Sequence, residues 1–216
     1  MRRFFRKFIY LIPFAGLIAS CSPEIDLSTE EKDIAVTQYD KEQDFSLLNT
    51  FYMYDTVMYV TDEKPTPNEG HNHDDLIIST VRQNLLSYGW TEVTDTINNV
   101  ADVAILLSTL KVDVYYYYQY WNYYWGWYPG WGGGYYPGYP NWGVSYGYSA
   151  GTVLVDMMNR AGDLSVSDDP DNPRVDLPLV WSGGVNGILS GSQENIESRL
   201  SRQLNQVFVQ SPYLNK

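Results

Sequence analysis

The chain's only two histidines, His71 and His73, stand in a short segment rich in carboxylates, Glu69-Gly70-His71-Asn72-His73-Asp74-Asp75. Imidazole and carboxylate groups are common zinc and copper ligands in proteins, which makes His71 and His73 weak candidates for a metal site. The alternative is a solvated loop whose aspartates cap the helix expected to follow it. Because composition alone does not arrange ligands in space, we expect no metal and no cofactor here.

Cys21 is the only cysteine, and the residues before it are typical of a secretory signal peptide. A basic head is followed by an apolar run from Phe8 to Ala19, which is too short to span a membrane as a stable helix. The end of the segment, Ile18-Ala19-Ser20-Cys21, resembles the bacterial lipobox. That resemblance implies a signal peptide over residues 1–20 and a mature N-terminus at a lipidated Cys21.

The residues after Cys21 indicate the destination of such a lipoprotein. Residue 22 is Ser, not the Asp that favours retention in the inner membrane of Gram-negative bacteria, so we expect the outer membrane. One acyl chain holds a protein only marginally, whereas several hold it firmly. We expect a lipidated tether over residues 21–37, followed by a single domain over residues 38–216. Whether the domain faces the periplasm or the outside stays open.

The charge of the chain excludes one class of partner. The net charge is −12, and removal of the four basic residues of the signal peptide leaves ten basic residues against 26 acidic ones, or about −16. Binding to nucleic acid depends on Lys and Arg that neutralise phosphates, so we expect no nucleic-acid partner. About 196 mature residues suit one domain with a substantial core.

No arrangement of residues typical of an enzyme is visible in the sequence. Gly132-Gly133-Gly134 is not followed by the Lys-Ser/Thr pair of a phosphate-binding loop. The acidic stretch from Asp163 to Asp176 lacks the ligand spacing and distal Glu of an EF-hand. We expect a non-enzymatic protein, and the third-ranked alternative is an enzyme that uses carboxylates or a metal at His71 and His73.

The most unusual segment is aromatic and uncharged. Residues 115–148 contain 13 Tyr and 5 Trp, and no charged residue lies between Asp113 and Asp156. The ends of the segment are rich in β-formers, whereas its middle is rich in Gly and Pro, which interrupt a strand ladder. The pattern predicts a long β-hairpin with a Gly/Pro/aromatic tip.

Three interpretations of this hairpin remain open. The first is that its rings only cover a sheet face, although alternation along a strand must leave part of the Tyr115–Tyr118 run on the other face. The second is an interaction surface for an envelope protein, and the third is a glycan-binding surface. The candidate surface residues are Tyr116, Tyr118, Tyr120, Trp121, Trp125, Trp127, Trp131 and Trp142.

Hydrophobic periodicity gives the elements that must position these residues. Strands are expected at residues 50–54 (extending towards 60), 90–93, 101–118, 145–157 and 179–189. One helix is expected from Asp74 or Asp75 to Gly89, and a second from Ser190 or Ser192 to Ser211-Pro212, with Ser190 and Gln193 as a capping box. We therefore predict an α+β fold, a mostly antiparallel sheet with two helices packed on one face and a long aromatic β-hairpin.

Several short pieces occur in an order that resembles one known family. They are Tyr39-Asp40 and Asp44-Phe45 ahead of Thr50-Phe51, then Gly89-Trp90, Ala101-Asp102-Val103, Tyr148 with Gly151 to Asp156, Leu179-Val180-Trp181-Ser182-Gly183, and the closing helix before Pro212. Over residues 39–214 the chain resembles the domain-of-unknown-function family numbered 4136, a group of bacterial envelope lipoproteins. The resemblance implies an α+β lipoprotein domain and no known activity or site residue.

Overall fold

The structure is a computed structural model of the whole chain. It describes residues 34–61, 71–95, 99–111, 135–137, 151–161, 165–166, 175–186 and 192–216. The expected signal peptide and most of the expected tether and aromatic hairpin lie outside the described residues.

The main sheet has seven strands, and its longest neighbours run antiparallel. The order is β1-β10-β7-β5-β2-β4, with β3 also paired to β5. The pairs β1–β10, β10–β7 and β7–β5 are antiparallel, whereas the short strands β2, β3 and β4 make parallel pairs. Their bounds are Ile34–Tyr39 (β1), Thr50–Met53 (β2), Met58–Val60 (β3), Thr91–Glu92 (β4), Val103–Leu110 (β5), Thr152–Asn159 (β7) and Leu179–Asn186 (β10).

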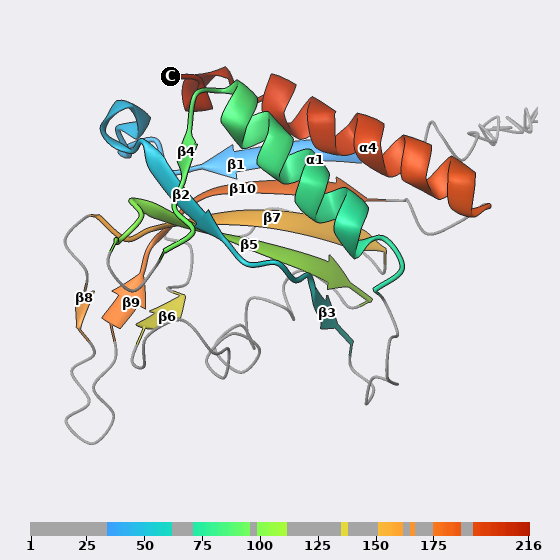
Figure 1. Cartoon of the computed structure of the whole chain (residues 1–216), viewed down its shortest axis with the longest axis horizontal. Coiled ribbons are helices and arrows are strands. Elements are labelled where there is room, and N and C mark those ends of the chain that lie inside the picture. Colours follow the sequence, from blue (N-terminus) through green and yellow to red (C-terminus); the bar gives the residue numbers. More distant parts are fainter. Residues whose placement is uncertain are drawn as a thin grey trace, which may run out of the picture.

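A second, three-stranded sheet lies on the side of the main sheet away from the helices (Figure 1). It is formed by β6 (Tyr135–Pro137), β9 (Val175–Leu177) and β8 (Ser165–Val166), in that order. β6 is the one described piece of the predicted aromatic hairpin, and it pairs in parallel with β9.

Two helices, α1 (Asp74–Ser87) and α4 (Gln193–Val209), lie side by side across one face of the main sheet (Figure 1). In α1, Ile77, Val81 and Leu85 are buried, as expected from their helical spacing. Gly89 follows the helix with φ +88°, a left-handed conformation that ends helices and favours Gly. The predicted α+β fold, with a mostly antiparallel sheet and two helices, is therefore confirmed.

The second helix is defined by its caps and its buried stripe. Ser192, rather than Ser190, is the N-cap, and its hydroxyl accepts a hydrogen bond from the Asn195 backbone N–H at 3.4 Å. Leu200, Leu204 and Val207 are among its buried residues. The helix ends ahead of the short 3-10 helix η3 (Pro212–Leu214), because Pro cannot continue the hydrogen-bond ladder.

Both faces of the central strands are buried. On the helix side, Ile105, Val155 and Trp181 belong to the main core. On the other face, Leu106 and Leu154 are also buried. This explains why the first residues of β5 are all apolar, whereas a strand with one exposed face alternates apolar and polar residues.

A very close contact between the two layers joins α4 to β10. A Cβ atom on Gly183 would lie 2.2 Å from Val207 Cγ1 and 2.9 Å from the Trp181 ring, so only glycine fits there. Trp181 is fully buried beside this contact, and its indole N–H donates to Ser211 Oγ at 2.9 Å. The helix therefore rests on the strand backbone itself.

The last residues of the chain connect α1 to the start of the domain. The Trp90 indole N–H donates to the Leu214 carbonyl at 2.8 Å, and the Lys216 backbone N–H donates to the Tyr88 carbonyl at 2.8 Å. The Lys216 ammonium lies 3.9 Å from the Trp90 ring centroid and donates to the carbonyl of Phe45, in the 3-10 helix η2 (Phe45–Leu47). Burial lowers the pKa of Lys216, against the opposing charges of Asp102 and Asp44.

Asp102 joins the start of β5 to the start of β2. Its carboxylate accepts hydrogen bonds from the backbone N–H of Asn49 at 2.8 Å and of Thr50 at 2.9 Å, and from the Thr50 hydroxyl at 2.9 Å. The Asp102 backbone N–H donates back to Thr50 Oγ1 at 2.9 Å. Burial raises the pKa of Asp102, but these hydrogen bonds and the charge of Lys216 outweigh it and hold the pKa below its usual value.

The Gly183 contact predicts a large effect from the smallest possible substitution. Gly183→Ala forces α4 away from β10, and we expect the free energy of unfolding to fall by about 1–3 kcal/mol. Urea unfolding followed by tryptophan fluorescence measures this change. Gln83→Ala, on the exposed side of α1, is the control and should stay within about 0.5 kcal/mol of wild type. An unchanged unfolding midpoint for Gly183→Ala would contradict the packing described.

The Asp102 hydrogen bonds predict a pH-dependent contribution to stability. Because the folded-state pKa lies below the unfolded value of about 3.9, the stabilisation is present above that pH and is lost as the pH falls through the folded-state pKa. We expect Asp102→Asn to cost about 1–3 kcal/mol at pH 7 and progressively less in the acid range. Urea titrations between pH 7 and pH 3, with the exposed Glu42→Gln as control, measure the difference. A difference that does not change with pH would refute the assignment.

Candidate functional site

An irregularity between β2 and β3 brings a carboxylate to the edge of the sheet. Both strands pair in parallel with β5. Met53 lies opposite Ile105 and Met58 lies opposite Ser108, so five residue steps from β2 to β3 lie opposite only three residue steps of β5. The two extra residues form a bulge at residues 54–57, in which Asp55 is exposed. Bulges of this kind redirect side chains and are frequent beside functional sites.

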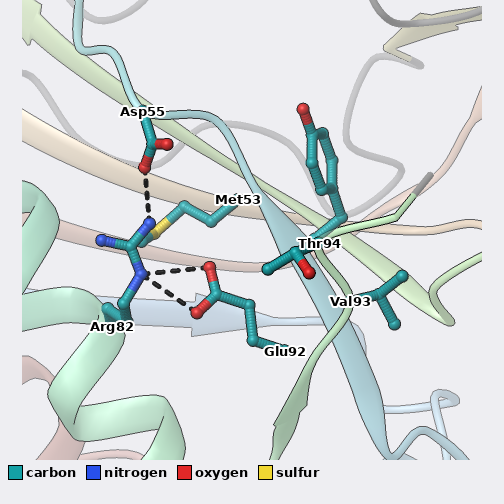
Figure 2. A pocket seen from close by; sticks show the side chains of 7 residues that line it. Met53, Asp55, Arg82, Glu92, Val93 and Thr94 are labelled. Atoms are coloured by element: carbon teal, nitrogen blue, oxygen red, sulfur yellow. Dashed lines mark hydrogen bonds and ion pairs between the residues drawn. The ribbon is translucent and has the colours of Figure 1, made fainter.

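The redirected carboxylate meets an arginine from α1. Arg82 Nη2 donates to Asp55 Oδ1 at 2.6 Å, and Arg82 Nε lies 3.0 and 3.1 Å from the two carboxylate oxygens of Glu92, in β4. Figure 2 shows the guanidinium held between the two acids. The exposed fraction of the side chain is 28% for Arg82, 18% for Glu92 and 84% for Asp55. The inner pair is thus sheltered, whereas Asp55 lies almost fully in solvent.

The two carboxylates of the cluster keep the Arg82 guanidinium protonated. Partial burial lowers the pKa of Arg82, but the hydrogen bonds and charges of Asp55 and Glu92 outweigh it and raise the pKa above its ordinary value. The guanidinium is therefore charged throughout the physiological range, and its plane is held by its carboxylate partners.

These side chains line an open pocket of about 420 Å³. It lies between the N-terminal strands and α1, and its lining residues are Tyr52, Met53, Asp55, Arg82, Glu92, Val93 and Thr94. The wall combines one aromatic ring, two apolar side chains, one hydroxyl group and the charged trio. Polar groups make up more of this lining than apolar ones.

The two histidines named as weak metal candidates lie at the start of α1, and each meets a different carboxylate. His71 Nδ1 lies 2.8 Å from Asp74 Oδ2, and His73 Nδ1 lies 3.7 Å from Glu197 Oε1, on α4. Within the described residues, no group of three or more His, Cys, Asp or Glu side chains is placed to hold a metal ion. His73, not an aspartate, is the N-cap of α1, and its side chain makes no capping hydrogen bond.

The other predicted site residues lie outside the described part of the chain. These are the lipidation residue Cys21 and the eight aromatic candidates Tyr116, Tyr118, Tyr120, Trp121, Trp125, Trp127, Trp131 and Trp142. Their roles therefore stay predictions. The acidic stretch 163–176 is described only at residues 165–166 and 175–176.

The Arg82 cluster was not predicted from the sequence. Arg82 is 27 residues from Asp55 and 10 from Glu92, and none of the three stands in a recognisable motif. The one available signal was that Arg82 is the only basic residue of α1 and lies next to the buried Val81. A lone arginine beside a buried stripe indicates a partner but does not identify it.

Comparison with known families identifies the domain. A family model described as "Domain of unknown function (DUF4136)" matches residues 35–213. The chain belongs to the DUF4136 family. The resemblance drawn from the short sequence pieces is thereby confirmed, and the match begins just after the first described residue, Ile34.

One solved structure agrees with this membership. A crystal structure of a DUF4136 family protein from Bacteroides thetaiotaomicron is 28% identical in sequence, with a TM-score of 0.63 over 85% of this chain and 97% of that chain. Two dodecamer structures of PelC from Paraburkholderia phytofirmans are 10% identical, with TM-scores of 0.35 and 0.34 over 85% of this chain and 99% of theirs. No curated protein matches the sequence. None of the described helices is long and apolar enough to cross a membrane.

Proposed function

We propose that this DUF4136 domain is tethered to the outer membrane of a Gram-negative bacterium by lipid on Cys21. The observation that carries the proposal is the sequence Ile18-Ala19-Ser20-Cys21 after a basic head and a short apolar run. The first described strand, β1, begins at Ile34, four residues inside the segment expected to be tether. Thirteen residue steps separate Cys21 from Ile34, so the tether reaches at most about 45 Å when fully extended.

On this proposal the domain is a non-enzymatic interaction or assembly module of the envelope. The uncharged aromatic segment 115–148 supports this role, because Tyr and Trp contribute large contact areas and a polar edge to protein interfaces. The net negative charge of the mature chain supports it as well, since anionic headgroups repel an acidic domain and leave membrane attachment to the lipid. The partner of this module is then an envelope protein that docks on the aromatic segment.

Lipidation predicts a clear result for substitutions at the cleavage site. Cys21→Ala removes the thiol that takes the lipid, and we expect it to abolish incorporation of an alkyne palmitate, to leave the signal peptide uncleaved and to raise the apparent mass. Ser20→Ala keeps a small residue before the cysteine and should label like wild type. Metabolic labelling, followed by separation of inner and outer membranes on a density gradient, measures both properties. Equal labelling of Cys21→Ala and wild type would exclude Cys21 as the anchor.

Docking through the aromatic segment predicts loss of a partner when the segment is shortened. We expect crosslinking and affinity purification from native envelopes to recover a specific protein with the wild type and not with a variant lacking residues 119–145. Triple substitution of Trp125, Trp127 and Trp131 by Ala is the milder version and should reduce recovery of the same protein. Circular dichroism of each variant checks that the domain still folds. An identical set of crosslinked proteins in all samples would remove the aromatic segment from the proposal.

A further inference from the structure

The main sheet ends on one side at β1, and the outer edge of this strand is open. The strand order places β1 at one end of the sheet and the two-residue strand β4 at the other. The Asp40 backbone N–H donates to the Val180 carbonyl at 2.9 Å, so residue 40 faces β10. Backbone groups alternate sides along an antiparallel strand, and therefore Ala35, Thr37 and Tyr39 direct their N–H and C=O groups away from β10.

A single side chain meets these outward backbone groups in the described part of the chain. The Gln210 side-chain amide, just beyond α4, donates to the Ala35 carbonyl at 3.2 Å, which confirms the direction of the alternation. No described residue bonds to the outward backbone groups of Thr37 or Tyr39. The edge thus presents a row of backbone donors and acceptors, the feature that allows a further strand to join a sheet.

The composition of β1 lacks the features that natural proteins use to keep such edges unpaired. Residues 34–39 contain no charged residue, no Pro and no Gly, and the pairing with β10 continues over six residues without a bulge. Four of the six, an Ile, a Val, a Thr and a Tyr, are strong β-formers.

The side of α4 next to this edge is uncharged as well. Gln203, Gln206 and Gln210 follow one another at spacings of three and four, so they share one side of the helix, and the bond from Gln210 to Ala35 places that side beside β1. The whole chain carries a net charge of −12, so two copies repel each other over most of their surface. An uncharged edge with an uncharged helix side above it lets two copies approach with little repulsion.

We propose that β1 pairs antiparallel with β1 of a second copy of this chain, about a two-fold axis at Thr37. The outward residues are symmetric about Thr37, so Thr37 faces its own counterpart and Ala35 faces the Tyr39 of the other copy. Each of these three pairs exchanges two hydrogen bonds, or about six in total. Registers centred on Val36 or Gln38 would use only two pairs from within β1, which selects Thr37 as the axis.

This self-complementary edge is the reason for choosing a second copy over an unrelated strand. A small Ala beside a large Tyr fits better across the interface than two Tyr side by side. The exposed Gln210 side chain swings aside to free the Ala35 carbonyl. The proposal goes beyond the proposed function, because it requires neither the lipid on Cys21 nor the aromatic segment.

The first test removes the outward donor at the axis. The Thr37 N–H takes no part in the pairing with β10, so Thr37→Pro leaves the sheet of each copy paired. We expect sedimentation velocity to show a dimer of the full-length protein in detergent. Thr37→Pro should raise the dissociation constant at least about tenfold, because both hydrogen bonds at the axis are lost. Thr37→Val keeps the N–H and should dimerise like wild type, and circular dichroism checks that each variant folds.

The second test reports the register by disulfide formation. Residues that form a hydrogen-bonded antiparallel pair have Cα atoms about 5.5 Å apart, within the range of a disulfide, so we expect Thr37→Cys to give linked dimers on mild oxidation. Ile34, although 48% exposed, lies six residue steps, or about 20 Å, from its counterpart, so Ile34→Cys should stay unlinked. Mass spectrometry of the linked peptides separates this bond from any bond made by Cys21.

Several results would overturn the proposal. They are a monomer at every concentration, equal association of Thr37→Pro and wild type, and equal linking of Ile34→Cys and Thr37→Cys. If Thr37→Pro does not fold, the two cysteine variants still decide the question, since neither changes a backbone donor. A wild type that stays monomeric alone but takes up a strand of another envelope protein on β1 would assign the edge to that protein and would also overturn the proposal.

Discussion

The contact of α4 with the bare backbone of β10 fixes the position of every group that α4 carries. At Gly183 there is no room for even one methyl group, because Val207 Cγ1 occupies the place of a Cβ atom. Trp181 packs beside this contact against Phe208, with ring centroids 5.6 Å apart, and bonds to Ser211 just beyond the helix. The strand thus sets both the distance of α4 from the sheet and the point at which the chain leaves the helix.

The candidate pocket depends on this contact through α1. Tyr88, next to the end of α1, packs against Phe208 of α4 and donates its hydroxyl hydrogen to the Phe208 carbonyl at 2.8 Å. Asn84 donates to Asn205 across the same helix pair at 2.7 Å. With α1 held in this way, Arg82 meets Asp55 from the bulge after β2 and Glu92 from β4. A loss of packing at Gly183 therefore displaces the pocket residues, although Gly183 and Val207 do not line the pocket.

The features that the sequence predicted are those encoded locally. The buried stripe of α1, the left-handed Gly89 after it and the end of α4 before Pro212 all follow from residues within a few positions of one another. The parallel pairing of β2 with β5 was not predicted, since apolar periodicity does not encode strand direction. The Arg82 cluster was missed for a related reason: its members are brought together only by a crossover helix and a bulge.

The strand β10 is held from both faces at neighbouring residues, and this explains why its register is unique. Gly183 faces α4, whereas Ser182, directly opposite Asp156 of β7, points to the other face and donates to the Asp156 carboxylate at 2.6 Å. Asp156 is fully buried, so a hydrogen bond to its carboxylate offsets part of a large desolvation cost. A slip of one residue would reverse the two faces. A slip in one direction would place the serine hydroxyl against Val207 and the Trp181 ring opposite the carboxylate, and a slip in the other direction would place Gly183 opposite the carboxylate, so in both cases the carboxylate loses its serine partner.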